Sequence, residues 1–303
     1  MIDLSATPLV DVDWLEAHMK DPTLRIVDAR WRSRDSGKNL FASGHIPGAV
    51  HLSWDGDITR DTSKARWIIL PPADFAAMAG AAGIGDDTRV IAYTGEDDSA
   101  AGYLWWALRY CGYEQVAILD GGLTRWLAEK KPVATQIDPP DAEIFTPRPQ
   151  KHLIATTEEI KSILNDPNAD VCFVDTRPPE QFKGSAVWTP QGSLHLPEGE
   201  SGVTNGGRLM RGGRLPGAIH QHAVLNLDPD KAWSFKSREV LRQRALDAGV
   251  DPEKRIITYC GCGISASLGL FALHLAGFEN IALFDASWEE WGTDASLPIE
   301  RDE

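Results

Sequence analysis

Short apolar runs recur along the chain, and longer segments of helical period lie between them. The runs IVD, VIAY and VAIL in the first half, and FVD, IITY and IALF in the second, are brief, rich in β-branched residues and ended by turn residues, as buried strands are. The intervening helical patterns each end at a glycine, a common helix stop, and cover residues 70–83, 99–112, 237–249 and 264–277. Alternating strands and helices predict parallel pairing with right-handed crossovers. We therefore expect α/β domains, each a mostly parallel central sheet flanked by helices on both faces.

The order of these runs occurs twice. The first half contains the blocks RIVDAR, GHIPGAVHL, RVIAYTG and GYEQVAILDGGLTRW, at 25–30, 44–52, 89–95 and 112–126. The second half has CFVDTR, GRLPGAIHQ, RIITYCG and GFENIALFDASWEEW, at 172–177, 213–221, 255–261 and 277–291. Four matched blocks in matched order predict two copies of one domain. We place an N-terminal domain at 1–135, a proline-rich linker at 136–153 and a C-terminal domain at 154–303.

The second copy carries an insertion between its first two blocks. In the first half 17 positions separate Val27 from Gly44, whereas 39 separate Val174 from Gly213 in the second. The additional segment is rich in glycine and turn residues. It is either a surface excursion or a loop that folds over the active site, since loops of this kind often carry function.

Composition narrows the class of protein. The 303 residues are 43% hydrophobic and 24% charged, which fits two ordinary globular domains of roughly 150 residues each. The net charge of −14 argues against a nucleic-acid partner, because neutralising phosphates requires clustered Lys and Arg. The chain start lacks a signal-peptide pattern, and no apolar run approaches the ~18 residues that a membrane helix needs. We expect a cytoplasmic protein with no membrane partner.

Of the four cysteines, one lies where chemistry is expected. Cys111 and Cys172 sit in apolar surroundings and are interpreted as buried small hydrophobes. Cys260 follows a buried strand and precedes an apolar helix, at the strand end where open α/β sheets bind ligands. Backbone N–H groups and the helix dipole there favour the thiolate, the reactive form of cysteine. The predicted active-site loop is Cys260, Gly261, Cys262, Gly263, Ile264 and Ser265.

The repeat supplies an internal control for this prediction. In the first half, Thr94 stands where the second has Cys260, and the loop continues with Glu96, Asp97 and Asp98. Those carboxylates would repel an anion. The first copy is therefore expected to be catalytically silent, and the second to be active.

The motifs GHIPGAVHL, ILDGGLTRW, YCGCGIS and FDASWEEW together resemble the tandem-domain rhodanese family, the thiosulfate and 3-mercaptopyruvate sulfurtransferases. The resemblance covers nearly the whole chain. It implies that the N-terminal domain is inactive and that Cys260 carries sulfur as a persulfide. The implied donor is thiosulfate or 3-mercaptopyruvate, and the acceptor is cyanide, a small thiol or a reduced thioredoxin. The family requires no metal and no organic cofactor.

The same resemblance leaves the donor open. The loop is neutral, as in the mercaptopyruvate enzymes, but Cys262 stands where that family has serine, and Ser265 where it has threonine. Gln181 replaces the first of two substrate-binding arginines, and Arg66-Trp67 occupies the region of a family histidine. The candidate replacements for the substrate-binding cation are Lys183, Arg208, Arg211 and Arg214. The acidic residue that the family borrows from its first domain is Asp55 or Asp57.

Three rival classes of function make different demands on this loop. Cysteine phosphatases use a longer loop that ends in arginine, which this chain lacks. A zinc site on Cys260 and Cys262 would need two further ligands, although a reversible disulfide between these cysteines stays a hypothesis. The main alternative to an enzyme is a non-catalytic or redox-regulated sulfur carrier or interaction module that uses the same two thiols.

Overall fold

The computed structural model describes residues 3–31, 36–96, 99–205 and 207–302, and these form two compact units. The first unit comprises the described residues up to Arg60, together with Ile69–Lys151 and Leu227–Lys236. The second comprises Asp61–Ile68, His152–Asn226 and the described chain from Ser237 onward. The units thus broadly follow the two sequence halves, but segment 61–68 groups with the second and segment 227–236 with the first.

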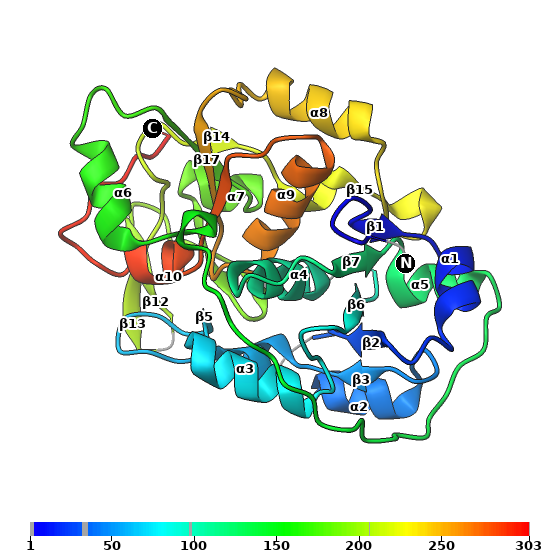
Figure 1. The fold of residues 1–303 in the computed structure, drawn as a ribbon. Coiled ribbons are helices and arrows are strands. Elements are labelled where there is room, and N and C mark those ends of the chain that lie inside the picture. The colour runs from blue at the N-terminus through cyan, green and yellow to red at the C-terminus, as the bar shows by residue number, and fades with distance from the viewer. Residues whose placement is uncertain (1–2, 32–35, 97–98, 206, 303) are drawn as a thin grey trace. The chain divides into compact units, whose positions relative to one another are not determined.

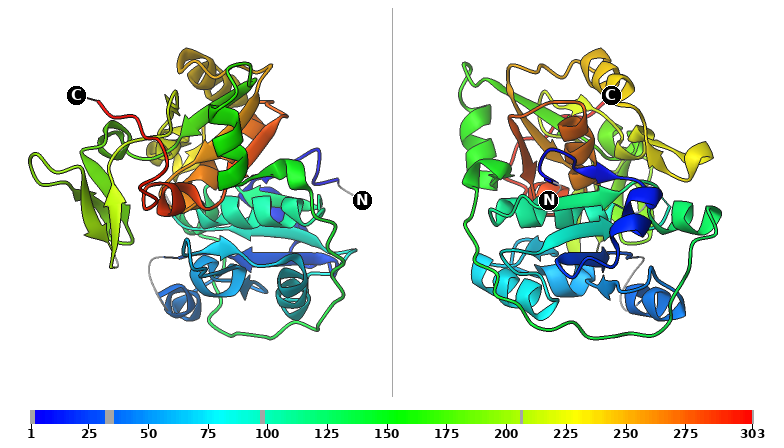
Figure 2. Two further views of the ribbon diagram at one scale, coloured as in Figure 1. Left: turned by 90° about the vertical axis from the view of Figure 1, so that its left-hand side faces the viewer. Right: turned by 45° about the vertical axis from the view of Figure 1, so that its right-hand side comes forward.

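The first unit is built on a parallel sheet with strand order β1-β7-β6-β2-β3 (Figure 1). Its strands are β1 (Leu9–Val10), β2 (Leu24–Asp28), β3 (Val50–His51), β4 (Thr59–Arg60), β6 (Arg89–Tyr93), β7 (Val116–Leu119), β15 (Leu227–Asp228) and β16 (Ser234–Phe235). Its helices are α1 (Val12–His18), α2 (Ser36–Ser43), α3 (Pro72–Ala81), α4 (Ala100–Tyr110) and α5 (Gly122–Ala128). Helical ribbon lies on both faces of this blue-to-teal sheet (Figure 2).

The second unit repeats this topology, with strand order β14-β9-β17-β18-β8 in its main parallel sheet. Its strands are β8 (Ile154–Ala155), β9 (Val171–Asp175), β10 (Ala186–Thr189), β11 (Gly192–His195), β12 (Gly202–Asn205), β13 (Arg208–Arg211), β14 (Ile219–His220), β17 (Arg255–Tyr259) and β18 (Ile281–Phe284). Its helices are α6 (Thr157–Leu164), α7 (Pro179–Lys183), α8 (Arg238–Asp247), α9 (Ile264–Leu275) and α10 (Ser287–Trp291). Strand β5 (Ile68–Ile69) spans the boundary between the units.

The apolar runs of the sequence form the centres of the two sheets. Strands β6 and β17 each pair in parallel with neighbours on both sides, and their residues are buried apart from the partly exposed Arg255. Burial of successive residues means that both faces of these strands are covered. The four predicted helices are confirmed as α3, α4, α8 and α9. The glycines that follow α4 and α9, Gly112 and Gly277, have a φ of 83°, which glycine adopts most readily at a helix end.

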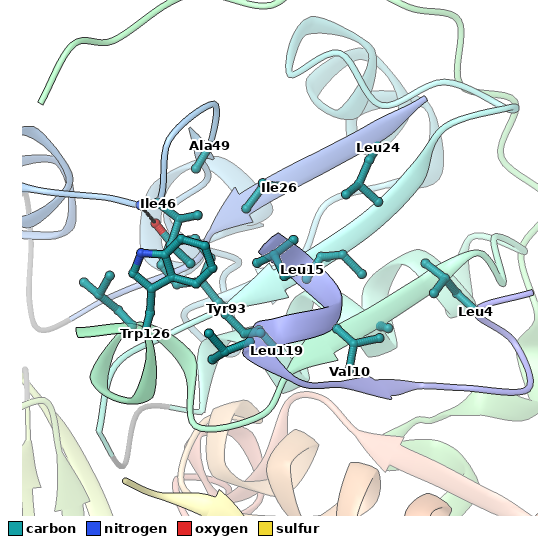
Figure 3. Close-up of a cluster of buried hydrophobic side chains, with 14 of the residues drawn as sticks. Leu4, Val10, Leu15, Leu24, Ile26, Ile46, Ala49, Tyr93, Leu119 and Trp126 are labelled. Carbon is teal, nitrogen blue, oxygen red and sulfur yellow. Dashed lines mark hydrogen bonds between the residues drawn. The ribbon is translucent and has the colours of Figure 1, made fainter. Parts of the chain in front are cut away.

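A hydrophobic cluster of the first unit packs against its sheet (Figure 3). Its labelled side chains are those of Leu4, Val10, Leu15, Leu24, Ile26, Ile46, Ala49, Tyr93, Leu119 and Trp126. The hydroxyl of Tyr93 reaches through this cluster and accepts a hydrogen bond from the Ile46 N–H at 3.2 Å. The polar tip of a core side chain is thus satisfied, as buried polar groups require.

The insertion of the second copy folds into two antiparallel hairpins rather than an irregular loop. Strand β10 pairs with β11, and β12 pairs with β13. The hairpins carry two residues of the candidate site, because Trp188 lies on β10 and Arg208 begins β13.

The proline-rich segment after α5 is extended and is held against the first unit by its backbone. The N–H groups of Glu143, Arg148 and Gln150 donate to carbonyls of Gly80, Cys111 and Tyr110 at 2.7–2.9 Å. Among the described residues, no helix is long and apolar enough to cross a membrane. The cytoplasmic location stays a prediction.

Candidate active site

Cys260 lies between the central strand β17 and the helix α9 of the second unit. Gly263 ends the loop in the left-handed region, with a φ of 87°, and α9 begins at the next residue. A side chain with a Cβ would be strained in this conformation, so glycine is needed for the tight turn. The loop therefore brings Cys260 to the start of the helix, where backbone N–H groups have no partner within the helix.

The start of α10 supports the loop from the side. The Cys260 N–H donates to the Ser287 hydroxyl at 3.0 Å, and that hydroxyl donates to the Phe284 carbonyl at 2.7 Å. The N–H groups of Trp288 and Glu289 donate to the carbonyls of Cys260 and Gly261, at 3.0 and 2.8 Å. These bonds leave the reactive loop little freedom to change shape.

The environment of Cys260 favours its thiolate. Burial opposes the charge, but hydrogen bonds from the Cys262 and Ser265 side chains, and then from the backbone N–H groups of Cys262 and Ala266, lower the pKa of Cys260 to about 6. The side chain is only 1% exposed. At neutral pH most molecules therefore hold a thiolate at this position.

The pKa of Cys262 shifts in the opposite direction. Burial and the neighbouring Cys260 thiolate raise the pKa of Cys262 well above its usual value. Cys262 thus stays protonated, and its S–H donates to the Cys260 sulfur. Both cysteines are free thiols in the structure. Among the described residues, no group of three or more His, Cys, Asp or Glu is placed to hold a metal ion.

A buried ion pair lies behind the loop. The Arg177 Nε and Nη2 atoms grip the Asp175 carboxylate, with a shortest distance of 2.6 Å, and Nη2 also donates to the Gly213 carbonyl at 2.6 Å. The Arg177 Cζ lies 4.5 Å from the ring centroid of Trp288. Burial opposes the charge of Arg177, but Asp175, and to a smaller extent Tyr259 and Cys260, raise its pKa.

A second charged group adjoins the loop and was not anticipated from the sequence. Glu289 is 1% exposed, and its carboxylate receives the Arg66 guanidinium, with Nε–Oε1 at 2.7 Å and Nη2–Oε2 at 3.2 Å. The Trp188 ring covers Gly261 so closely that a Cβ there would lie 2.4 Å from Trp188 Cγ. Trp67 packs edge-to-face on Trp188, with centroids 5.4 Å apart. Trp188 therefore lies directly against the loop, and Trp67 lies against Trp188.

The predicted substrate-binding cations have different surroundings. Arg208 donates to the Glu289 carbonyl at 3.0 Å and to the Thr293 hydroxyl at 2.7 Å, and it also bonds the Lys64 carbonyl. Its Nη1 lies 3.7 Å from the Glu289 carboxylate, so Arg208 is close to the loop.

The other predicted cations hold the end of the chain. Arg211 donates to carbonyls at and beyond the end of α10, and Arg214 pairs with Glu300 and Asp302. Lys183 ends α7, and its backbone carbonyl accepts the Asp302 N–H at 3.2 Å.

Gln181, which replaces a family arginine, and the two acidic candidates, Asp55 and Asp57, each have hydrogen-bond partners. Gln181 is buried, and its Nε2 donates to the Ser193 hydroxyl at 2.9 Å. Asp55 and Asp57 lie in the first unit on the short π-helical turn Trp54–Ile58. Asp57 accepts the Ser53 N–H at 2.8 Å, and Asp55 accepts the Ser53 hydroxyl. Of the first-half loop residues, Asp97 and Asp98 lie outside the described residues.

Comparisons with known proteins agree with this geometry. The Rhodanese-like domain family matches residues 11–129 and again 156–294. The chain therefore belongs to the rhodanese family, as a tandem-domain sulfurtransferase.

Individual relatives match over nearly all of the chain. The mitochondrial thiosulfate/3-mercaptopyruvate sulfurtransferase 1 of Arabidopsis thaliana is 30% identical, over 98% of this chain and 79% of its own length. The sulfur carrier protein TtuD of Thermus thermophilus is 28% identical over 97% of each chain. The crystal structure of SseA from Escherichia coli, a 3-mercaptopyruvate sulfotransferase, superposes with a TM-score of 0.76 at 25% identity, covering 93% of this chain and 98% of that one.

Proposed function

We propose that this sulfurtransferase moves a sulfane sulfur through a persulfide on Cys260. The observation that carries the proposal is a thiol whose pKa is about 6, held in a loop that donates hydrogen bonds to its sulfur from side chains and backbone. A buried structural cysteine has the reverse property, since burial alone raises the pKa of Cys111 to about 12.

The first half-reaction loads the enzyme. The Cys260 thiolate attacks the outer sulfur of thiosulfate, the S–S bond breaks, and its electron pair leaves with sulfite. With 3-mercaptopyruvate the C–S bond breaks instead, and the carbon takes up a proton to release pyruvate. Either way Cys260 becomes Cys260–S–S⁻. The hydrogen bonds from the Cys262 S–H and the loop N–H groups to the Cys260 sulfur support this step, because such donors favour negative charge on sulfur.

The second half-reaction removes the sulfur from the enzyme. Cyanide, a small thiol or a reduced thioredoxin attacks the outer sulfur and takes it, and the electron pair of the S–S bond returns to Cys260 as the thiolate. No net oxidation or reduction of the enzyme occurs in this ping-pong cycle. The protonated Cys262 provides a hydrogen-bond donor where the family has a serine.

Mass spectrometry of the intact protein tests the loading step directly. Incubation with thiosulfate or 3-mercaptopyruvate, followed by removal of the donor, should add the mass of one sulfur atom, which cyanide then removes. Cys260→Ser should gain no mass, whereas Cys172→Ser, another buried cysteine of the same unit, should load normally. A wild-type protein that gains no sulfur from either donor would refute the proposal.

A second candidate is a sulfur carrier that is loaded once and delivers its sulfur to a protein partner. The similarity to a protein named a sulfur carrier favours this alternative. Steady-state turnover separates the two functions. Repeated formation of sulfite or pyruvate with cyanide or a small thiol as acceptor supports the enzyme, while a single stoichiometric loading with no turnover supports the carrier.

A further inference from the structure

The Arg66 guanidinium is fixed beside the active-site loop by contacts within the second unit. Two of its nitrogens bind the buried Glu289 carboxylate, and the Glu289 backbone N–H binds the Gly261 carbonyl at 2.8 Å. The Arg66 guanidinium is therefore connected to the loop through one intervening residue, Glu289. Burial opposes the charge of Arg66, but Glu289 and, more weakly, Cys262 raise its pKa, so the group remains a cation at all relevant pH values.

Two arginines share one buried carboxylate in this cluster, and Asp61 also lies near enough to raise the pKa of Arg66. Arg66 and Arg208 both face the single Glu289 carboxylate, at 2.7 and 3.7 Å. Arg208 is further engaged by two backbone carbonyls and by Thr293. Glu289 uses Nε and Nη2 of Arg66, so Nη1 has no partner among the described residues, and the Arg66 side chain remains 24% exposed. One cation would suffice to neutralise Glu289.

Aromatic side chains hold Arg66 in place. Its Cζ lies 4.5 Å from the centroid of the Trp67 ring, and Trp67 packs on Trp188, which covers Gly261. Trp67 has a φ of 55°, in the left-handed region that non-glycine residues rarely adopt. Such strain persists only where the surroundings enforce it, and it often occurs at functional sites.

Building on the persulfide function, we propose that Arg66 binds the anionic group of the sulfur donor, a sulfonate or a carboxylate, and so determines specificity for anionic donors. A guanidinium offers parallel N–H groups that match such oxygens, and it is weakly hydrated enough to bind them at a partly buried site. Thiosulfate carries its sulfonate, and mercaptopyruvate its carboxylate, on the side away from the transferred sulfur. A cation beside the loop, rather than on it, fits both donors.

The competing explanation is that Arg66 only neutralises Glu289 and supports the loop. The two roles differ in a measurable way. A structural role affects every reagent that reaches Cys260 equally, whereas an anion-binding role affects anionic reagents alone.

Alkylation of Cys260 by iodoacetate, an anion, and by iodoacetamide, its neutral analogue, makes this distinction. The wild type should favour iodoacetate, relative to a free thiol, and Arg66→Gln should lower the iodoacetate-to-iodoacetamide rate ratio by about tenfold, the size of a charge-assisted contact. Arg66→Lys, which keeps the charge, should retain most of the ratio. Inorganic sulfate should slow iodoacetate in the wild type but not in Arg66→Gln.

Arg242→Gln is the matched control, because Arg242 also lies over an aromatic ring but bonds the Ala276 carbonyl at the far end of α9, about 18 Å from the loop by helix length. Its rate ratio should equal that of the wild type. An unchanged ratio in Arg66→Gln, or equal losses with both reagents, would overturn the proposal. Should Arg66→Gln fail to fold, sulfate protection of the wild type decides instead, and the absence of selective protection counts against the proposal. Alkylation requires no sulfur transfer, so this result stands apart from the persulfide test.

Discussion

The two units place the same buried scaffold behind two different loops. In each, an aspartate at the end of a central strand grips the arginine two residues later, and a tyrosine of the neighbouring strand bonds the same carboxylate. The two sets are Asp28, Arg30 and Tyr93 in the first unit, and Asp175, Arg177 and Tyr259 in the second. The tyrosine hydroxyls accept equivalent N–H groups, from Ile46 and Leu215. The scaffold is therefore a property of the fold and not of the chemistry.

Two of the differences lie directly above this scaffold. Thr94 in the first unit corresponds to Cys260 in the second, and Gly122 corresponds to Ser287. Gly122 and Ser287 have nearly the same φ, 50° and 49°, yet only Ser287 has a hydroxyl to receive the Cys260 N–H. A non-glycine residue is kept in a strained conformation where it supports the Cys260 loop, whereas glycine occupies the equivalent position of the first unit. The comparison teaches that one buried frame can carry loops of different chemical character.

The largest expected effect comes from breaking the scaffold itself. Asp175→Asn leaves a fully buried guanidinium without its counterion, and the free energy of unfolding should fall by about 3–5 kcal/mol. Asp28→Asn should cost less, because the Arg30 side chain is 10% exposed while that of Arg177 is 1% exposed. Urea unfolding measures both. An equal or larger loss in Asp28→Asn would contradict the explanation by burial.

Grafting the thiol onto the first unit tests whether the loop, rather than the cysteine, creates reactivity. In a Cys260→Ser background, Thr94→Cys should react with iodoacetamide at neutral pH about thirtyfold more slowly than Cys260, because a pKa near the ordinary value of about 8.5 leaves roughly one thiolate per thirty molecules. The first-unit loop continues with Glu96, and Gly122 stands where the second unit has the supporting hydroxyl of Ser287. If the thiol introduced at position 94 reacted as fast as wild-type Cys260, the surrounding loop would be shown to be unimportant.

Removing the neighbouring thiol should have a smaller, pH-dependent effect. Cys262→Ala deletes a hydrogen bond that lowers the pKa of Cys260, so that pKa should rise from about 6 toward its ordinary value. Alkylation should slow by about two- to fivefold at neutral pH, while at high pH, where either thiol is fully ionised, the rates should converge. The measurement is the iodoacetamide rate as a function of pH. Cys262→Ser supplies a stronger O–H donor and should keep the pKa of Cys260 as low as in the wild type or lower, and an unshifted profile in Cys262→Ala would exclude the proposed bond.

The smallest effect is expected for Ser287→Gly, which makes the second unit resemble the first. Loss of the hydroxyl leaves the Cys260 N–H without its acceptor, but glycine relieves the strained φ, so stability should change by no more than about 1 kcal/mol. Sulfur loading should slow modestly. Ser287→Ala keeps the strain and removes the bond, so it should be less stable than Ser287→Gly, and the opposite order would argue against this interpretation.

Much of the fold could be predicted because it depends on local pattern. The apolar runs of β6 and β17 and the glycines after α4 and α9 mark elements whose form is set by nearby residues. The loop around Cys260 was likewise predictable, since a strand, alternating glycines and a helix follow one another directly along the chain.

The surroundings of the loop could not be predicted in the same way. Ser287, Glu289 and Trp188 reach Cys260 or Gly261 from distant positions, and nothing local marks Ser287 as the residue that accepts the Cys260 N–H. Arg66 precedes the loop by nearly two hundred positions, and only the grouping of segment 61–68 with the second unit brings it to Glu289. The one signal available was the repeat, because FDASWEEW departs from DGGLTRW where Ser287 stands.

Part of the support for the Cys260 sulfur comes from the main-chain N–H groups of Cys262 and Ala266. A point mutation can replace any side chain, but among the natural residues only proline removes a backbone N–H. The main-chain contribution to stabilising a negative sulfur is thus less sensitive to mutation than the tryptophan and arginine side chains around the loop are. Redesign of this protein for new donors can accordingly change those side chains and leave Cys260 and its loop unaltered.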